Sequence, residues 1–261
     1  VACGQRQCGE WPVHASTNSA RAGIVLASKL VEDGDMIEVP LSGLALSLLP
    51  ILLIGWITWH WGGRVGILTV ATGRMVVQLL LIGYVLSFLF GVRSPWVALG
   101  VVVFMIVISS WIAIRTVRVR RWDSYRDALL AIGIGGGLVY ILVIFGVLGV
   151  EPWYEPKYAI SLSGMVFANA MTAVTLSAER YDAEREAGSE AELARNTAWN
   201  AALIPQVNSF LAVGLVALPG IMTGQVLAGA DPMDAVRYQI MVMAMVMGSA
   251  GLAVAIFLVR R

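Results

Sequence analysis

The chain has 261 residues, of which 58% are hydrophobic and 13% are charged, whereas an ordinary soluble domain has about 45–50% apolar and about 25% charged residues. This composition excludes a water-soluble globular domain. The 18 Lys and Arg residues nearly balance the 17 Asp and Glu residues, which leaves a net charge of +1. The sequence therefore has no basic field that would attract nucleic acid, and we expect the lipid bilayer as its surroundings.

Residues 1–39 are polar and mixed, and they precede the first long apolar stretch. We interpret them as an N-terminal extension on the extracytoplasmic side, separate from a membrane domain of residues 40–261. The two cysteines of the chain, Cys3 and Cys8, lie within this extension. One disulfide and two free thiols are both compatible with their spacing.

Seven stretches of the sequence are apolar for long enough to cross a bilayer. A spanning helix needs about 20 mostly apolar residues, because the hydrocarbon core is about 30 Å thick and each residue rises about 1.5 Å. We therefore predict an all-α, polytopic membrane helix bundle with about seven transmembrane spans. The predicted spans are Leu41–His60, Val65–Phe90, Pro95–Ile114, Asp127–Val150, Tyr158–Ala178, Ala201–Ala228 and Ala235–Val259.

The sixth predicted span is the least regular of the set. It contains Pro205 and the dipeptide Pro219-Gly220, and each proline removes a backbone donor from the helix. We expect the helix to break or kink at both places, which makes this a broken or re-entrant span.

Arginines indicate which loops face the cytoplasm, because short loops rich in Lys and Arg favour that side. The loop between the third and fourth spans has the clearest excess, formed by Arg115, Arg118, Arg120, Arg121 and Arg126. Successive crossings then place the charged segment 179–199 and the pair Arg260-Arg261 on the same side. The predicted location is a cell membrane, either inner or plasma membrane, with several crossings.

The residues that soluble enzymes use for catalysis are scarce. Two histidines, His14 and His60, cannot supply a His-based triad or a His-rich metal cage. No Walker A sequence is present, and Gly135-Gly136-Gly137 lies inside an apolar span, where close helix packing is the better interpretation. We expect no catalytic residues, no metal site and no cofactor in this chain; any ATP would be hydrolysed by another chain.

Polar side chains inside the spans are candidates for a substrate pathway, because each costs free energy to bury in lipid. Hydrogen bonding between helices is the alternative interpretation of each one. The methionines have a similar alternative: for most of them, contact with lipid or packing of gaps in the bundle is favoured over ligation of a soft ion. The candidates are Asn169, Met165, Gln206, Asn208, Met222, Thr223, Gln225 and Gln239.

A strongly charged segment, ERYDAEREAGSEAELAR, runs from Glu179 to Arg195. Its pattern is helical with both signs interspersed. It is compatible with a solvated cytoplasmic helix and with a docking surface for a soluble partner.

Three segments resemble the FetB-type permease subunits of ABC transporters. These are GRMVVQLLLIGYVLSFLF (Gly73–Phe90), LSGMVFANAMTAVTL (Leu162–Leu176) and AALIPQVNSFLAVGLVALPGIMTGQVLAGADPMDAVRYQIMVM (Ala201–Met243). The resemblance covers about residues 41–258, and its LPG, MTG, DP and YQI elements form a long, specific pattern. The family includes a bacterial protein assigned to iron export and plant proteins linked to aluminium tolerance.

The resemblance implies a homodimeric permease subunit, in the family's pattern of two membrane and two ATP-binding subunits, with ATP and Mg bound by the partner. It implies outward transport of a metal ion such as iron; the plant relatives widen this to aluminium-linked or UDP-sugar transport. Alternatives from the residues alone are a gradient-driven secondary transporter or channel, and a non-transporting scaffold.

The resemblance also implies that the charged segment docks the ATP-binding subunit. The docking candidates are Arg185, Glu190, Glu192 and Arg195. The family usually carries an LGA element here, and this chain has Gly188-Ser189 in its place. The segment has either diverged or lost residues.

Overall fold

The computed structural model describes residues 40–63, 65–91, 94–116 and 121–261. The predicted N-terminal extension, with Cys3 and Cys8, lies outside the described residues. Internal contacts divide the chain into two units, Val1–Met75 and Val76–Arg261.

The described residues are helical and contain no named strand, which confirms the predicted all-α class. In the first unit lie α2 (Leu41–Ser47), α3 (Leu49–His60) and the start of α4 (Val65–Gly91). The second unit continues with α5 (Pro95–Ala113), the short η2 (Ile114–Thr116), α6 (Arg121–Leu130), η3 (Ala131–Gly136), α7 (Gly137–Ile141), η4 (Leu142–Val147), α8 (Pro156–Glu186), α9 (Ala191–Ala212), α10 (Gly220–Leu227) and α11 (Pro232–Val259).

Six helical segments within the described residues are long and apolar enough to cross a membrane. They correspond to the predicted spans except the sixth, which the structure divides between α9 and α10. The continuous helix Trp122–Val147 includes two π-helical stretches, η3 and η4. The prediction of a polytopic membrane bundle is confirmed, whereas a count of seven uninterrupted spanning helices is not.

The prediction of a break at Pro205 is wrong, because α9 runs through this residue to Ala212. Proline lacks the N–H that would bond to the carbonyl four residues earlier. Membrane helices tolerate this loss when neighbouring groups satisfy the freed carbonyl. The interruption lies between Ala212 and Gly220, where Pro219 caps α10.

The last helix begins at a side-chain cap. The carboxylate of Asp231 accepts hydrogen bonds from the backbone N–H groups of Met233 at 2.8 Å and Asp234 at 3.3 Å. Pro232 follows in the first turn, where a missing N–H costs nothing because that group would have no helical partner. The Asp-Pro pair of the sequence pattern thus fixes where α11 starts.

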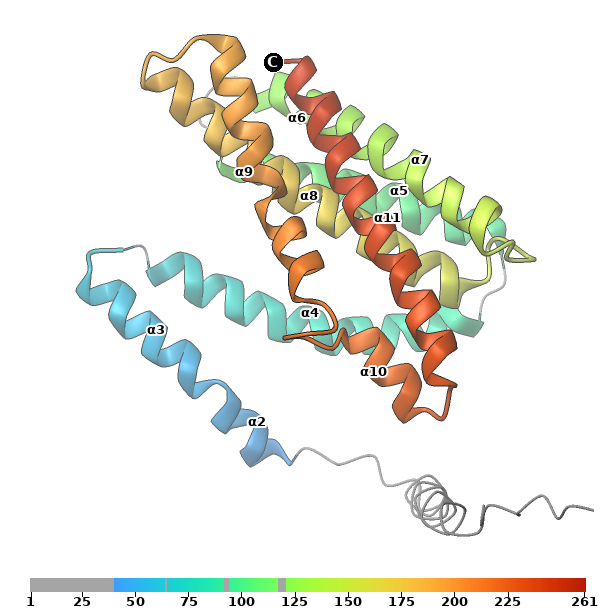
Figure 1. Cartoon of the computed structure of the whole chain (residues 1–261). Coiled ribbons are helices and arrows are strands. Elements are labelled where there is room, and N and C mark those ends of the chain that lie inside the picture. Colours follow the sequence, from blue (N-terminus) through green and yellow to red (C-terminus); the bar gives the residue numbers. More distant parts are fainter. Residues whose placement is uncertain (1–39, 64, 92–93, 117–120) are drawn as a thin grey trace, which may run out of the picture. The chain divides into compact units, whose positions relative to one another are not determined.

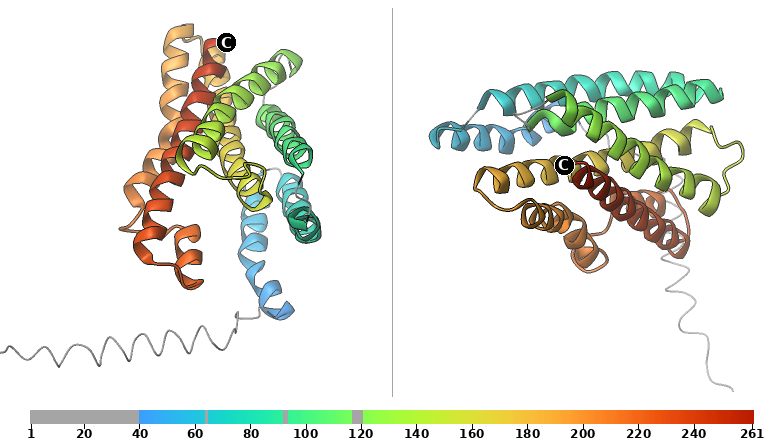
Figure 2. Two further views of the ribbon diagram at one scale, coloured as in Figure 1. Left: turned by 90° about the vertical axis from the view of Figure 1, so that its right-hand side faces the viewer. Right: turned by 90° about the horizontal axis from the view of Figure 1, so that it is seen from above.

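Helix α8 is the centre of the second unit. It contacts α5, α9, α11 and η3, and Figures 1 and 2 show it between α5 and the pair formed by α9 and α11. The hydroxyl of Tyr181 at the end of α8 donates to the carbonyl of Arg261 beyond the end of α11, at 3.5 Å. Since these ends meet, α8 and α11 run in the same direction.

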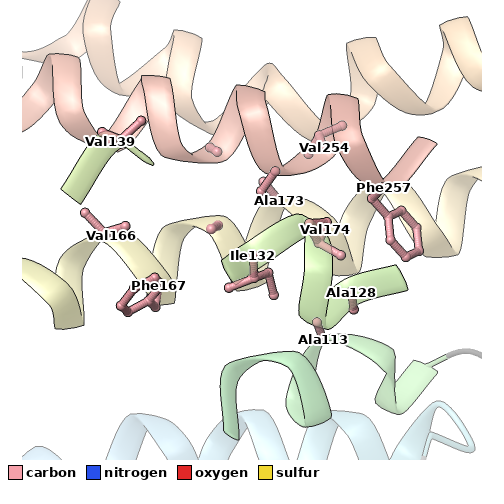
Figure 3. Close-up of a cluster of buried hydrophobic side chains, with 14 of the residues drawn as sticks. Ala113, Ala128, Ile132, Val139, Val166, Phe167, Ala173, Val174, Val254 and Phe257 are labelled. Atoms are coloured by element: carbon pink, nitrogen blue, oxygen red, sulfur yellow. The ribbon is translucent and has the colours of Figure 1, made fainter. Parts of the chain in front are cut away.

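The core uses small side chains where helices approach one another. Ala128, Ala170, Ala173 and Ala253 are fully buried. Figure 3 shows Ala128 and Ala173 in one buried cluster with larger side chains such as Ile132. Lipid is as apolar as leucine, so burial alone does not drive helices together in a membrane. Close packing between small residues therefore stabilises this bundle.

Two glycines of the Gly-Gly-Gly run meet neighbouring helices closely, which confirms the packing interpretation at these positions. A Cβ atom at Gly135 would lie 2.6 Å from the backbone nitrogen of Ala253 in α11. A Cβ atom at Gly136 would lie 3.0 Å from the ring of Phe167 in α8. Gly137 has no such neighbour within 4 Å.

Candidate substrate path and docking hairpin

The interruption between α9 and α10 is a compact turn of the backbone. Gly214 has a φ of +80°, a conformation that favours glycine, and its N–H donates to the carbonyl of Ala217 at 3.0 Å. Leu215 and Val216 at the tip are 89% and 86% exposed. Non-helical backbone at membrane depth is tolerated where protein or a water-filled cavity surrounds it, and interrupted helices of this kind border substrate sites in transporters.

Gln206 lies on the buried stripe of α9. Ala194, Ala198 and Ala202 precede it at intervals of four residues, and all four side chains are buried. Residues four apart share one helix face, and α9 packs against α8 and α11. Gln206 is 5% exposed, and its side-chain oxygen Oε1 has no hydrogen-bond partner among the described residues.

Gln239 occupies the corresponding inner face of α11. It is 6% exposed and lies on a buried stripe with Ala235, Val242 and Met245. In the part of the chain that the structure describes, its Oε1 also lacks a hydrogen-bond partner, as does the Oε1 of the partly buried Gln225 in α10. Three of the predicted pathway residues therefore carry buried, unpartnered carbonyl oxygens.

Other pathway candidates are satisfied within their own helices. The side-chain amide of Asn169 donates to the carbonyl of Met165 at 2.8 Å. The hydroxyl of Thr223 donates to the carbonyl of Pro219 at 3.1 Å. Both side chains therefore already make a hydrogen bond within their own helix, unlike the Oε1 atoms of the three glutamines.

The remaining candidates differ in exposure. Met165 and Met222 are partly buried, whereas Asn208 is exposed on α9. Helix α11, which carries Gln239, contacts both α9 and α10, which carry the other two glutamines. The structure thus places these glutamines on adjoining helices without a direct hydrogen bond between them.

The charged segment forms the tip of a helical hairpin. The apolar part of α8 continues as helix to Glu186, and α9 begins at Ala191. The helical pattern predicted for this segment is confirmed. The turn contains Gly188 with a φ of +88°, and the N–H of Ser189 donates to the carbonyl of Glu184 at 3.0 Å. The residues present at the position of the LGA element therefore close a continuous turn.

Three of the four docking candidates lie on the surface of this hairpin. Arg185, Glu190 and Glu192 are exposed, and the guanidinium of Arg185 donates to the carbonyl of Ser189 at 2.8 Å. Arg195 differs, because it is partly buried and its Nε donates to the carbonyl of Leu258 in α11 at 3.2 Å. Arg195 thus ties the hairpin to α11.

A polar cluster that the sequence did not predict lies beside this hairpin. Arg261 donates to the hydroxyl of Ser124 in α6 at 2.9 Å and lies 3.5 Å from the carboxylate of Asp182 in α8. Arg260 lies 2.7 Å from the carboxylate of Asp127. The sequence showed only that these groups share one end of the bundle, because their pairing depends on how the helices pack.

Metal-binding clusters are absent from the part of the chain that the structure describes: no three His, Cys, Asp or Glu side chains come together there. The polar interior of this part offers amide oxygens in place of charged ligands.

Comparison with known proteins identifies relatives across the membrane domain. The model of the "Uncharacterised protein family (UPF0014)" matches residues 41–261. The chain is 34% identical over 213 residues to "UPF0014 membrane protein slr1647" of Synechocystis sp., covering 74% of this chain and 81% of that protein. No solved structure matches the chain.

Two further relatives have names that refer to a metal. The "Probable iron export permease protein FetB" of Escherichia coli is 34% identical over 200 residues, covering 70% of this chain and 75% of that protein. The "Protein ALUMINUM SENSITIVE 3" of Arabidopsis thaliana is 33% identical over 196 residues, covering 69% and 70%. The resemblance to FetB-type permeases is confirmed.

Proposed function

The chain belongs to the UPF0014 family of membrane proteins, and from this premise we propose that it is the permease subunit of an iron exporter powered by a separate ATP-binding subunit. The observation that carries the proposal is the 34% identity to a relative named as an iron export permease, over 70% of this chain. Under this proposal the chain itself does not hydrolyse ATP.

The hairpin between α8 and α9 supports the proposed partner. Its exposed tip presents Arg185, Glu190 and Glu192, and a charged helical tip beyond the membrane suits a soluble subunit better than it suits lipid. The same end carries the arginine-rich loop that the positive-inside rule places in the cytoplasm, where ATP is available.

The substrate path runs, in this proposal, along the helices that carry Gln206, Gln225 and Gln239. Two copies of the permease and two ATP-binding subunits would form the complete exporter. ATP binding in the partner would shift the hairpin, and alternating access would expose the path to each side in turn.

Transport into inverted membrane vesicles tests this function. Vesicles from cells that express the chain and its ATP-binding subunit are incubated with radioactive Fe²⁺ and ascorbate in the external solution. We expect ATP-dependent accumulation that the non-hydrolysable ATP analogue does not support. If iron accumulated to the same level with ATP, with the analogue and with no nucleotide, the proposal would be contradicted.

A gradient-driven transporter is the second candidate, because the interrupted span α9–α10 is typical of secondary transporters. In the same vesicles, it predicts accumulation driven by an imposed proton or sodium gradient with no ATP present. Abolition of transport by removing the ATP-binding subunit would exclude this candidate.

A further inference from the structure

Two glutamine side chains are placed where an apolar residue would ordinarily be found in a membrane bundle. Gln206 and Gln239 are 5% and 6% exposed, and neither Oε1 atom has a hydrogen-bond partner within the described part of the chain. A buried polar atom without a partner costs about 1–3 kcal/mol, and such atoms are rare in native proteins. Each of these oxygens is therefore an available acceptor for a hydrogen-bond donor from outside the chain.

The two oxygens belong to one group of packed helices. Gln206 lies on the face of α9 that carries Ala198 and Ala202, and Gln239 lies on the buried stripe of α11. Helices α9 and α11 contact each other, and both contact α8. One buried carbonyl acceptor therefore lies on each of two helices that contact each other.

The surrounding sequence limits what that species can be. Residues 128–150, 158–178, 193–230 and 235–259 contain no Asp, Glu, His or Cys. Hard cations stripped of water prefer carboxylate ligands, so a bare divalent ion would lose its hydration without gaining a charged ligand. An ion that keeps its water shell avoids this loss.

Water bound to a divalent cation is a strong hydrogen-bond donor, because the ion withdraws electron density from it. An unpartnered amide oxygen is a matching acceptor. We propose that Gln206 and Gln239 bind a hydrated divalent cation through its water shell, each Oε1 accepting a hydrogen bond from a metal-bound water. This inference rests on the proposed function for its substrate class, a metal ion, and names the hydrated form as the one recognised.

A substitution-inert complex tests the water-shell contact directly. The full chain is purified in detergent and titrated with Mn²⁺, whose free aqua ion is counted by electron paramagnetic resonance. Hexaamminecobalt(III) is then added, because its ammine ligands donate hydrogen bonds but do not exchange for protein ligands. We expect it to displace Mn²⁺ from the wild-type chain.

Two leucine variants locate the acceptors. We expect Gln206→Leu and Gln239→Leu each to weaken the binding of both Mn²⁺ and hexaamminecobalt(III) about tenfold, as for a lost hydrogen bond to a charged species. Asn200→Leu is the matched control on α9, because Asn200 is exposed and belongs to none of the candidate sites, and we expect its affinity to equal that of the wild type.

Three results would overturn the inference. The first is Mn²⁺ binding that hexaamminecobalt(III) does not displace, which would mean direct ligation by the protein. The second is wild-type affinity in both leucine variants, and the third is no binding of either probe to the wild-type chain. The displacement of Mn²⁺ by hexaamminecobalt(III) is measured on the wild-type chain, so it does not depend on whether the leucine variants fold. It also needs no ATP-binding subunit, so failure of the vesicle experiment would contradict the proposed function without affecting this result.

Discussion

Nε of Arg260 lies 2.7 Å from Oδ1 of Asp127, and the two residues are 133 positions apart in the chain. Arg260 follows α11 and Asp127 lies in α6, so this pair joins the first helical segment after the arginine-rich loop to the last helix. Together with Arg195 and Arg261, it connects α6, α8, α9 and α11 at the end of the bundle that carries the proposed docking hairpin.

We expect Arg260→Ala and Asp127→Ala each to lower the melting temperature of the purified chain by about 2–4 °C. A partly exposed ion pair contributes about 1 kcal/mol, and this corresponds to such a shift in a chain of this size. The double variant should lose little more than either single variant, because the pair is lost once. Thermal unfolding monitored by tryptophan fluorescence measures all three.

The control for this pair is Arg237→Ala. Arg237 pairs with Asp234 at 3.2 Å, but their side chains are 76% and 70% exposed. We expect less than about 1 °C of change here. Additive losses at Arg260 and Asp127 would show that the two residues do not act as a pair.

The close approach at Gly135 predicts that alanine destabilises the fold at this position but not at Gly137. Because a Cβ atom there would lie 2.6 Å from the backbone of Ala253, Gly135→Ala should force α11 and η3 apart and cost about 1–3 kcal/mol. The folded fraction, measured by size-exclusion chromatography in detergent, should fall. Gly137→Ala is the control and should fold as well as the wild type, since nothing lies within 4 Å of its Cβ position. Equal yields from both variants would refute the close packing.

The turn between α9 and α10 depends on Gly214. Its φ of +80° is costly for any residue with a Cβ atom, by about 1–2 kcal/mol. We expect Gly214→Ala to lower the melting temperature by about 2–6 °C. Gly220→Ala, at a position without positive φ and with no neighbour within 4 Å, should leave it within about 1 °C. A span that is continuous through this region in the native protein would tolerate both changes equally.

If the hairpin docks the ATP-binding subunit, charge changes at its tip should weaken partner binding without destabilising the fold. Reversing the charges of Glu190 and Glu192 to lysine changes two exposed positions, so the melting temperature should remain within about 1 °C of the wild type. Recovery of the ATP-binding subunit with the tagged chain should fall about tenfold, because complementary charge is lost at the proposed contact. The control is Arg237→Glu, an exposed charge reversal near the start of α11. Undiminished recovery with the hairpin variant would place docking elsewhere.

Much of the helical architecture follows from local patterns. Long apolar runs predict the membrane helices, and the interspersed positive and negative charges after Glu179 predict helix there. The turn at Gly188 that makes this segment a hairpin was not predicted. The course of α9 could not be predicted from Pro205, because a proline interrupts a membrane helix only where neighbouring groups leave the freed carbonyl unsatisfied. That condition depends on helix packing, which a single sequence does not specify.

The candidate site shows the same division. Composition indicates that polar residues gather in the last third of the chain, and this includes Gln206 and Gln239. The sequence could not distinguish them from Asn169, which satisfies its amide on its own helix at Met165. Likewise, the pairing of Arg260 with Asp127 requires α11 and α6 to meet, a relationship set by tertiary packing.

The proposal that a separate ATP-binding subunit powers this chain predicts the composition of the native complex. The tagged chain is purified from its own membrane in mild detergent, and the co-purifying proteins are quantified by mass spectrometry. We predict a P-loop ATPase in near-equal molar amount, with ATP hydrolysis in the same fraction. Recovery of the intact, folded chain with no P-loop protein in any mild detergent would contradict the claim.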